Sequence, residues 1–216
     1  MAIAYDASSS VGATTNTSVS WNHTVGSGKN RILFVAYGCG ASGQISSVTY
    51  NGVAMTRVGS ETTNNNMGLF MLVNPASGTH AVQINLSSSQ YIYGGAVSYS
   101  GAKQTGQPDS SNVRNASGTT SGNISTTVVK SGCWLVGVFN AASSGVTGGT
   151  NATIRTNLVN SERGIFDSNG IVGTGSQTAN MTSAGNASWG EVVASFSPFV
   201  DNPGNPIFFK GGYAGG

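Results

Sequence analysis

The chain has 216 residues, of which only 7% are charged, and its formal net charge is +2. The nine Lys and Arg residues are scattered, so the basic patch typical of nucleic-acid binders is missing and we exclude that class of partner. No apolar run approaches the roughly 18 residues of a membrane-spanning helix. A hydrophobic content of 38% with 32 Gly, arranged as short apolar stretches between small polar residues, predicts a folded many-stranded protein.

Strands are predicted along the first hundred residues from alternating or short continuous apolar stretches. The pair Asn51-Gly52 stands between two alternating stretches and predicts a tight hairpin, because a type I′ turn needs positive φ at both positions. The predicted strands cover residues 19–25, 31–39, 46–58, 67–74, 79–86 and 91–100.

The second part of the chain is predicted to begin with a long polar connection over residues 101–122 and then to resume strands. These strands cover residues 123–129, 132–140, 152–159, 162–171 and 188–197. No window has a sustained helical period with capping residues, so we expect almost no helix. Roughly ten to thirteen strands at this spacing predict one antiparallel, jelly-roll-like β-sandwich domain over residues 1–197.

The C-terminal stretch 198–216 differs in composition and holds three of the five prolines. Proline does not fit a central strand, so we expect an extended tail. Its apolar side chains predict that it docks on the parent domain or inserts into a neighbouring protein. We name as partner-binding residues Pro206, Ile207, Phe208, Phe209 and Tyr213.

The ionisable residues show no catalytic or metal-binding pattern. Glu162 and Asp167 are the one close pair of carboxylates, and five residues apart on a strand they point to opposite faces. His23 and His80 lie in predicted strands, without the strand–turn–helix serine motif of hydrolases. Two histidines and two separated cysteines are a poor zinc set. We therefore expect no enzyme activity, no cofactor and no metal.

Cys39 ends one predicted strand and Cys133 begins another. A disulfide between them is geometrically reasonable if those strands pair antiparallel. The alternative is two buried free thiols, the state expected after synthesis in a reducing compartment.

Several segments resemble a β-sandwich domain that recurs in phage virion proteins and bacterial surface proteins. They are residues 19–25, 30–36, 48–59, 72–84 and 94–102, with a weaker match at 131–139 and a closing strand at 188–196. The resemblance spans residues 2–197, leaves out the tail, and carries no catalytic motif. It implies a jelly-roll-like sandwich exposed on virions or cell surfaces.

We therefore expect a virion structural protein, such as a capsid decoration or tail-associated subunit, that packs against coat or tail proteins and copies of itself. The N-terminal residues have no positive region followed by an apolar stretch, so we expect no secretory signal and expect assembly in the host cytoplasm. The alternative is an extracellular carbohydrate-binding or adhesin module, with cell-surface glycans as partners. Its candidate sugar-stacking residues are Tyr50, Tyr91, Tyr93, Trp134 and Trp189, most of which we expect to pack in the core. A third reading, a hydrolase, needs carboxylates that converge in space.

Overall fold

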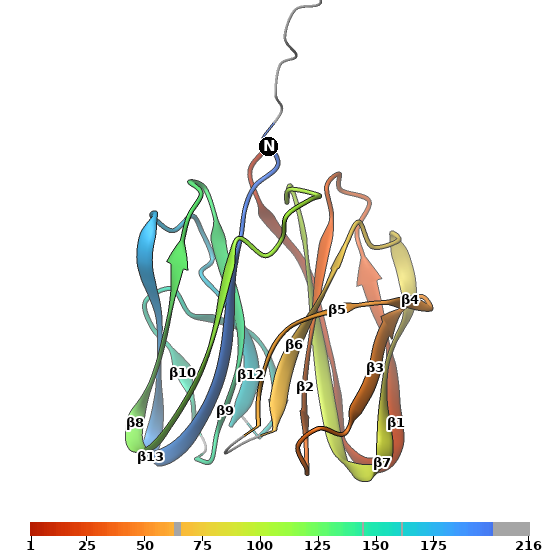
Figure 1. The fold of residues 1–216 in the computed structure, drawn as a ribbon, viewed down its shortest axis with the longest axis vertical. Coiled ribbons are helices and arrows are strands. Elements are labelled where there is room, and N and C mark those ends of the chain that lie inside the picture. The colour runs from red at the N-terminus through yellow and green to blue at the C-terminus, as the bar shows by residue number, and fades with distance from the viewer. Residues whose placement is uncertain (63–65, 144, 161, 201–216) are drawn as a thin grey trace, which may run out of the picture.

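The computed structural model describes residues 1–62, 66–143, 145–160 and 162–200, and all its regular structure is β (Figure 1). The described part contains no helix that could span a membrane. The strands are β1 (Ala4–Val25), β2 (Ile32–Cys39), β3 (Ile45–Tyr50), β4 (Val53–Ala54), β5 (Thr56–Glu61), β6 (Met67–Val73), β7 (Gly78–Ser100), β8 (Ser110–Val128), β9 (Trp134–Ala141), β10 (Thr147–Gly148), β11 (Thr153–Val159), β12 (Arg163–Asp167) and β13 (Gly175–Phe196).

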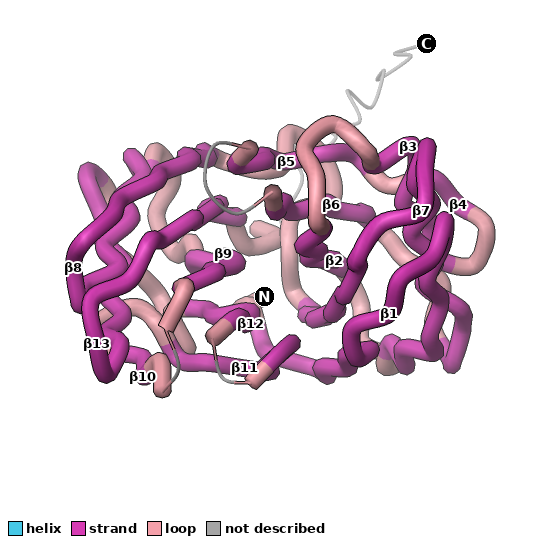
Figure 2. Tube along the Cα trace, turned by 90° about the horizontal axis from the view of Figure 1, so that it is seen from below, coloured by secondary structure: helices cyan, strands magenta, loops and turns pink. Residues whose placement is uncertain are grey.

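The strands form two antiparallel sheets, each built from one half of the chain. In the first half, the long strand β7 pairs with β1, β2 and β3, while β6 pairs with β2 and β5. In the second half, β13 pairs with β8, β9 and β10, while β12 pairs with β9 and β11. Figure 2 shows the two curled sheets side by side. The predicted all-β sandwich is confirmed, and its jelly-roll-like connectivity stays a prediction.

The two halves are an internal structural repeat. Their pairing schemes correspond strand by strand: β1 to β8, β2 to β9, β3 to β10, β5 to β11, β6 to β12 and β7 to β13. The contacts between the halves are reciprocal as well, because β11 lies beside β1 and β5 lies beside β8. Reciprocal contacts of this kind are what an approximate two-fold axis between two like units produces.

Register shows that the repeat extends to single residues. Tyr37 lies opposite Gly68 in the first half, and Phe139 lies opposite Gly164 at the same place in the second. A Cβ on either glycine would come within 3.0 Å of the facing aromatic ring. Each ring therefore requires its glycine, and these pairs anchor β6 on β2 and β12 on β9.

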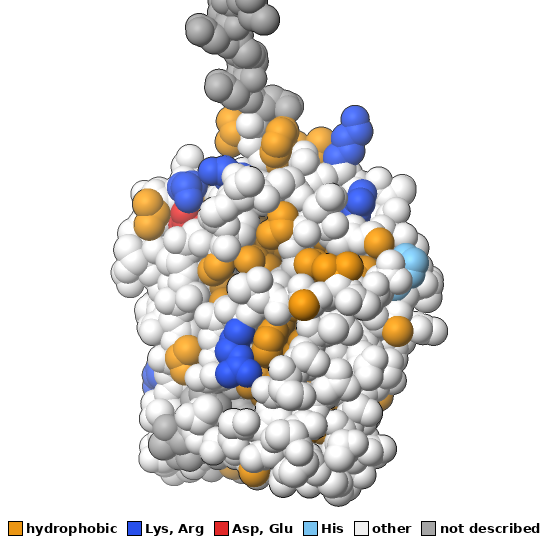
Figure 3. All heavy atoms as spheres, turned by 45° about the vertical axis from the view of Figure 1, so that its right-hand side comes forward, with side chains coloured by type: hydrophobic (Ala, Val, Ile, Leu, Met, Phe, Trp, Pro, Cys, Tyr) orange, Lys and Arg blue, Asp and Glu red, His pale blue; other side chains and the backbone are white. Residues whose placement is uncertain are grey.

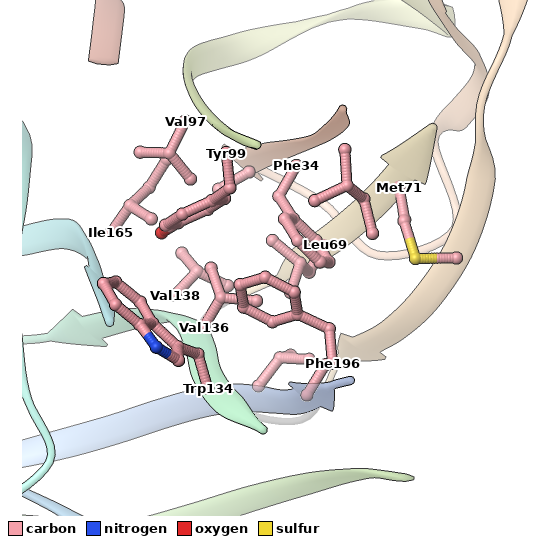
Figure 4. Packing of buried hydrophobic residues seen from close by; sticks show 14 of the residues in the cluster. Phe34, Leu69, Met71, Val97, Tyr99, Trp134, Val136, Val138, Ile165 and Phe196 are labelled. Atoms are coloured by element: carbon pink, nitrogen blue, oxygen red, sulfur yellow. The ribbon is translucent and has the colours of Figure 1, made fainter. Parts of the chain in front are cut away.

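The apolar core has three parts. One inner core lies within each curled sheet, and Tyr50 and Trp189 are their largest fully buried side chains. The third, which we call the interface core, joins the two sheets and includes Phe34, Tyr99 and Phe196 (Figure 4). The Tyr99 and Phe196 rings, from equivalent positions of β7 and β13, lie 5.0 Å apart. Burial of both faces explains why β2 and β9 read as continuous apolar runs.

One expectation on organisation needs correction. The long connection predicted over residues 101–122 spans only residues 101–109, because β8 begins at Ser110 and pairs with β13. Packing also continues past residue 197: Pro198 bridges to Ala102, and the Phe199 N–H donates to the Gly101 carbonyl at 2.7 Å. The Asn51-Gly52 turn is confirmed, with φ of 49° and 75° between β3 and β4.

Candidate functional site

One end of the molecule gathers the N-terminus, the connection between the halves and the segment that follows β13 (Figure 1). The Met1 amino group donates to the Phe199 carbonyl at 2.9 Å, and the Lys103 N–H donates to the Ser197 carbonyl at 2.9 Å. We call this end the pole. Segments distant in sequence meet there because the approximate two-fold axis brings the exits of β7 and β13 together.

A groove of about 710 Å³ lies at the pole. Its apolar part comes from the residues after β13, where Val200 is 73% exposed. Polar side chains of the connection and of the β8–β9 turn form the rest. The lining residues are Lys103, Gln104, Thr105, Lys130, Ser131, Ser197, Pro198, Phe199 and Val200.

The repeat explains why the groove exists on this side of the axis. After β7, the Gly101 N–H donates to the Lys29 carbonyl at 3.0 Å, which ties the chain to the β1–β2 turn. The residue at the Gly101 position after β13 is Pro198, which has no N–H to donate. The chain instead turns so that the Phe199 N–H meets Gly101. A space is therefore left between the residues after β13 and Ser131, which stands at the Lys29 position.

Two lysines flank the groove. Lys130 is held at its rim by Asp109, with 2.9 Å between Nζ and Oδ1. Burial alone would raise the pKa of Asp109, but the hydrogen bonds from Lys130 and from the Val129 and Lys130 amides bring it below its usual value. Lys103 has no ion pair within the described part of the chain. The groove thus combines apolar side chains, which suit an apolar peptide segment, with lysine side chains beside them.

Elsewhere the surface carries few charges. On the face in Figure 3, hydrophobic and charged side chains occupy only scattered patches. A second, polar hollow of about 350 Å³ opens on the second half and is lined by hydroxyl and amide side chains. They belong to Ser110, Ser111, Asn112, Ser125, Thr126, Thr127 and Ser176.

The carboxylates whose side chains are described do not form a catalytic pair. Five of the seven have described side chains, and each of these already has a structural partner. Asp167 accepts hydrogen bonds from Tyr99 and Arg155, while Glu162 lies 3.8 Å from Arg163 at the surface. Asp167 and Glu162 therefore have separate surroundings, one buried and one partly exposed, as their spacing predicted. Glu61 and Asp201 lie outside the described side chains.

The His23 site resembles hydrolase chemistry only in composition. Ser98 Oγ donates to Asp6 at 2.7 Å, so His23 Nε2, 3.1 Å away, must be the donor to Ser98. Burial lowers the pKa of His23 to about 4, against a smaller opposing effect of Asp6. A histidine that donates to the serine cannot take its proton, and all three groups stabilise the β1–β7 pair instead.

His80 is a strand histidine whose Nε2 lies 3.1 Å from the Ser77 carbonyl. Both histidines therefore have the hydrogen-bond partners expected of structural residues. Within the described chain, no three His, Cys, Asp or Glu side chains gather closely enough to hold a metal ion.

The proposed disulfide is not formed, because Cys39 and Cys133 are both buried free thiols. They lie in the inner cores of different halves, since β2 and β9 belong to separate sheets. Burial and the nearby Asp109 raise the pKa of Cys133 to about 12, which keeps the thiol protonated.

The aromatic candidates mostly pack inside, as expected. Tyr50, Tyr93, Trp134 and Trp189 are buried, whereas Tyr91 is 42% exposed. The predicted tail contacts Pro206, Ile207, Phe208, Phe209 and Tyr213 lie outside the described residues. Sequence reasoning missed the groove itself, whose signal is Pro198 at the position of Gly101.

Comparison with known proteins gives no further guide. No protein-family model matches the chain, and no curated protein or solved structure is significantly similar to it.

Proposed function

We propose that this chain is a non-enzymatic structural subunit of a virion surface, such as a capsid decoration or tail-associated protein. It acts by packing against coat or tail proteins and against copies of itself, with the pole as its docking end. The observation that carries the proposal is the gathering of an apolar, lysine-flanked groove and the start of an apolar C-terminal tail at one end of a rigid double sheet. An end of this kind suits attachment to coat or tail proteins, and the rest of both sheets would then stay exposed on the particle surface.

Two further features support a structural role. The described carboxylates and histidines have partners that stabilise strands, so their chemistry is already committed. The surface has little charge to attract small ionic substrates, whereas polar uncharged groups keep an exposed protein soluble.

The proposal is tested on particles purified from the cells that express the chain. Gold-labelled antibody against the folded chain should decorate intact particles in negative-stain images, with regular spacing. The test variant is Val200→Asp, which places a hydrated, negatively charged carboxylate where the groove has an exposed apolar side chain. This variant should fold normally and fail to enter particles; particles without label, or full incorporation of the variant, would contradict docking through the pole.

A second candidate function is the binding of neutral glycans by a surface module. The hydroxyl-lined hollow on the second half favours it, because uncharged hydroxyl and amide groups match the hydrogen-bonding groups of sugars. A glycan array read with the labelled chain separates the two functions. Saturable binding to one glycan class that is lost in Thr126→Val would favour a glycan-binding module. If no glycan on the array bound, this second function would be rejected.

A further inference from the structure

We propose that two copies of this chain pair antiparallel, edge to edge, through the stretch Ser18–Thr24 of β1. We call this stretch the β1 edge. A two-fold axis beside Trp21 joins the first-half sheets of the two copies into one continuous sheet. The inference goes beyond the proposed function, which places docking at the pole, because the β1 edge lies along the first half and joins copies of the isolated chain.

The hydrogen bonds of β7 show which way the β1 edge points its polar groups. The Ala81 carbonyl accepts from the Asn51 N–H on the β3 side, and Ala81 also lies opposite Asn22 of β1. The N–H and carbonyl of a strand residue point to the same side, so Asn22 and Ala81 are a non-hydrogen-bonded pair. The Asn22 groups therefore point away from β7. The same holds for the alternate residues of the β1 edge, which are Ser18, Ser20 and Thr24.

The equivalent edge of the second half, in β8, is closed by side chains of its own strand. Asn112 Nδ2 donates to the Ser125 carbonyl at 2.8 Å, and the Ser121 N–H donates to Thr119 Oγ1 at 3.1 Å. Ser125 stands at the position of Asn22, because each lies three residues from the end of its pairing with β13 or β7. This edge is therefore partly satisfied within the chain.

The β1 edge has no such closure. Ser9 stands at the position of Asn112, but its hydroxyl bonds the rings of His23, at 2.8 Å, and Trp21, at 3.0 Å, inside the first half. The described chain offers no hydrogen bond to the outward groups of Asn22. The exchange of asparagine for serine thus leaves the first-half edge open where the second-half edge is closed.

The β1 edge also lacks the usual protection of an edge strand, which is charge, proline, a bulge or short length. No Lys, Arg, Asp, Glu or Pro occurs between residues 7 and 25. A bulge between Asn16 and Ser18 limits the open stretch at one end. The Gly26 N–H, which donates to Asp6 at 2.8 Å, limits it at the other. Nothing within these limits opposes a further strand.

The other edges of the described sheets are short or covered. β4 and β10 have two residues each. β5 lies beside β8, and β11 lies beside the first part of β1, where the Ser8 hydroxyl donates to the Arg155 carbonyl at 3.2 Å. Among the described strands, the β1 edge is therefore the long edge that stays without a neighbour or a closing side chain.

A second copy fits because the β1 edge is complementary to itself. Its limits place Trp21 at its centre, so a two-fold axis there sets Ser18 opposite Thr24 and Ser20 opposite Asn22 of the second copy. In this register all four outward-pointing residues form hydrogen-bonded pairs. The facing side chains are hydroxyl and amide groups, and Thr24 already makes such a contact with a threonine of β7, 2.7 Å away. The half-buried Trp21 rings of the two copies then cover each other at the axis.

Sedimentation of the isolated full-length chain over a range of concentrations tests the pairing. The chain should show a monomer–dimer equilibrium. Asn22→Pro removes an outward N–H and keeps the β7 ladder, as proline does on edge strands. Each dimer loses two hydrogen bonds, so the dissociation constant should rise about tenfold or more. The matched control Ser125→Pro, at the equivalent position of β8, should leave it unchanged. A monomer at every concentration, or equal effects of two variants that circular dichroism shows to be folded, overturns the proposal.

Disulfide trapping on mixed chains tests the register without a proline. Chains with Ser20→Cys and chains with Asn22→Cys should cross-link to each other under glutathione disulfide, because Cα atoms of a hydrogen-bonded pair lie about 5.5 Å apart. Either variant alone should cross-link far less, since diagonal neighbours lie about 7–8 Å apart. The native cysteines are buried and do not compete.

The control mixture has Asn123→Cys and Ser125→Cys, at the equivalent positions of β8, and should not cross-link. Cross-linking of this mixture to the same extent, or of the single variants as fully as their mixture, overturns the proposal. Both experiments use the isolated chain, so their outcome is separate from whether it enters particles.

Discussion

Each half has a tryptophan that packs against a glycine of a paired strand, but the two halves take these two residues from opposite strands of the pair. In the first half Trp21 of β1 lies over Gly94 of β7, where a Cβ would approach the indole ring to 2.8 Å. In the second half Trp189 of β13 lies over Gly122 of β8, where the corresponding distance is 2.5 Å. Each half needs one tryptophan and one facing glycine, and the strand that supplies each is reversed.

The halves therefore share a frame, by which we mean the scheme of strand pairing, and they differ in the side chains that fill each inner core. The shared part includes a polar clasp, in which an aspartate accepts hydrogen bonds from a serine hydroxyl and a backbone amide. Asp6 accepts from Ser98 and Gly26, and Asp109 accepts from Ser195 and Val129. Pairing geometry constrains these groups strongly, whereas core volume can be redistributed between strands.

The largest expected effect is at Asp167, a buried polar residue that has no charged counterpart in the first half. Met71 stands at its position there. Asp167→Ala leaves Arg155, whose side chain is 15% exposed, and the Tyr99 hydroxyl without their acceptor. We expect a loss of about 3–5 kcal/mol in the free energy of unfolding, measured by urea denaturation. The control Glu162→Ala, at the surface, should cost less than about 1 kcal/mol. If Asp167→Ala and Glu162→Ala lowered the free energy of unfolding equally, the buried Asp167 would not stabilise the second half in the way we infer.

Glu191 makes the second half sensitive to rising pH. Burial raises its pKa to about 7, although Arg114 opposes the shift through a hydrogen bond and its charge. The unfolded chain releases this proton near 4.5, so stability is full below that pH and falls as pH rises towards 7. The loss should be on the order of 2 kcal/mol between pH 4.5 and 7.

The variant Glu191→Gln isolates this contribution. Subtracting its unfolding free energy from that of the natural chain across pH should leave a curve that declines with rising pH and levels above pH 7. A flat difference curve would show that Arg114 holds Glu191 charged throughout.

His23 gives the first half the opposite dependence. Burial lowers its pKa to about 4, so the unfolded chain takes up a proton near 6.5 before the folded chain does. Stability is full above 6.5 and is lost as pH falls towards 4, by on the order of 2 kcal/mol. The difference between the natural chain and His23→Gln should therefore rise with pH over this window. A curve that falls, like the one for Glu191, would contradict a buried neutral histidine.

Much of the frame could be predicted from the sequence, and the exceptions have physical reasons. β2 and β9 were visible because burial on both faces makes them apolar throughout. The first part of β8 was missed because its side chains give no apolar alternation, and Val113 is 40% exposed. This segment is held by main-chain hydrogen bonds to β13. Such bonds do not depend on the side chains, so the amino-acid composition does not reveal them.

The site was harder to predict than the fold. The sequence did not reveal the repeat, because Asp6 and Ser98 recur as Asp109 and Ser195 at different spacings, 92 and 86 residues, in a chain rich in serine. It did not reveal the groove either, because the significance of Pro198 appears only when register places it at the Gly101 position. Cys39 ends β2 as predicted, whereas Cys133 lies one residue before β9, and the sheets to which these strands belong could not be assigned from spacing.

The smallest expected effect compares the two polar clasps directly. Asp6 is exposed and accepts two hydrogen bonds, so Asp6→Ala should cost about 1 kcal/mol. The Asp109 side chain is fully buried and also pairs with Lys130, so Asp109→Ala should cost about 2 kcal/mol. Both values come from urea denaturation at pH 7, with Asp6→Asn and Asp109→Asn as isosteric controls. If Asp6→Ala proved the costlier change, the Asp6 clasp would stabilise the first sheet more than its exposure implies. The two halves would then be equivalent in backbone pairing but not in the contribution of their clasps to stability.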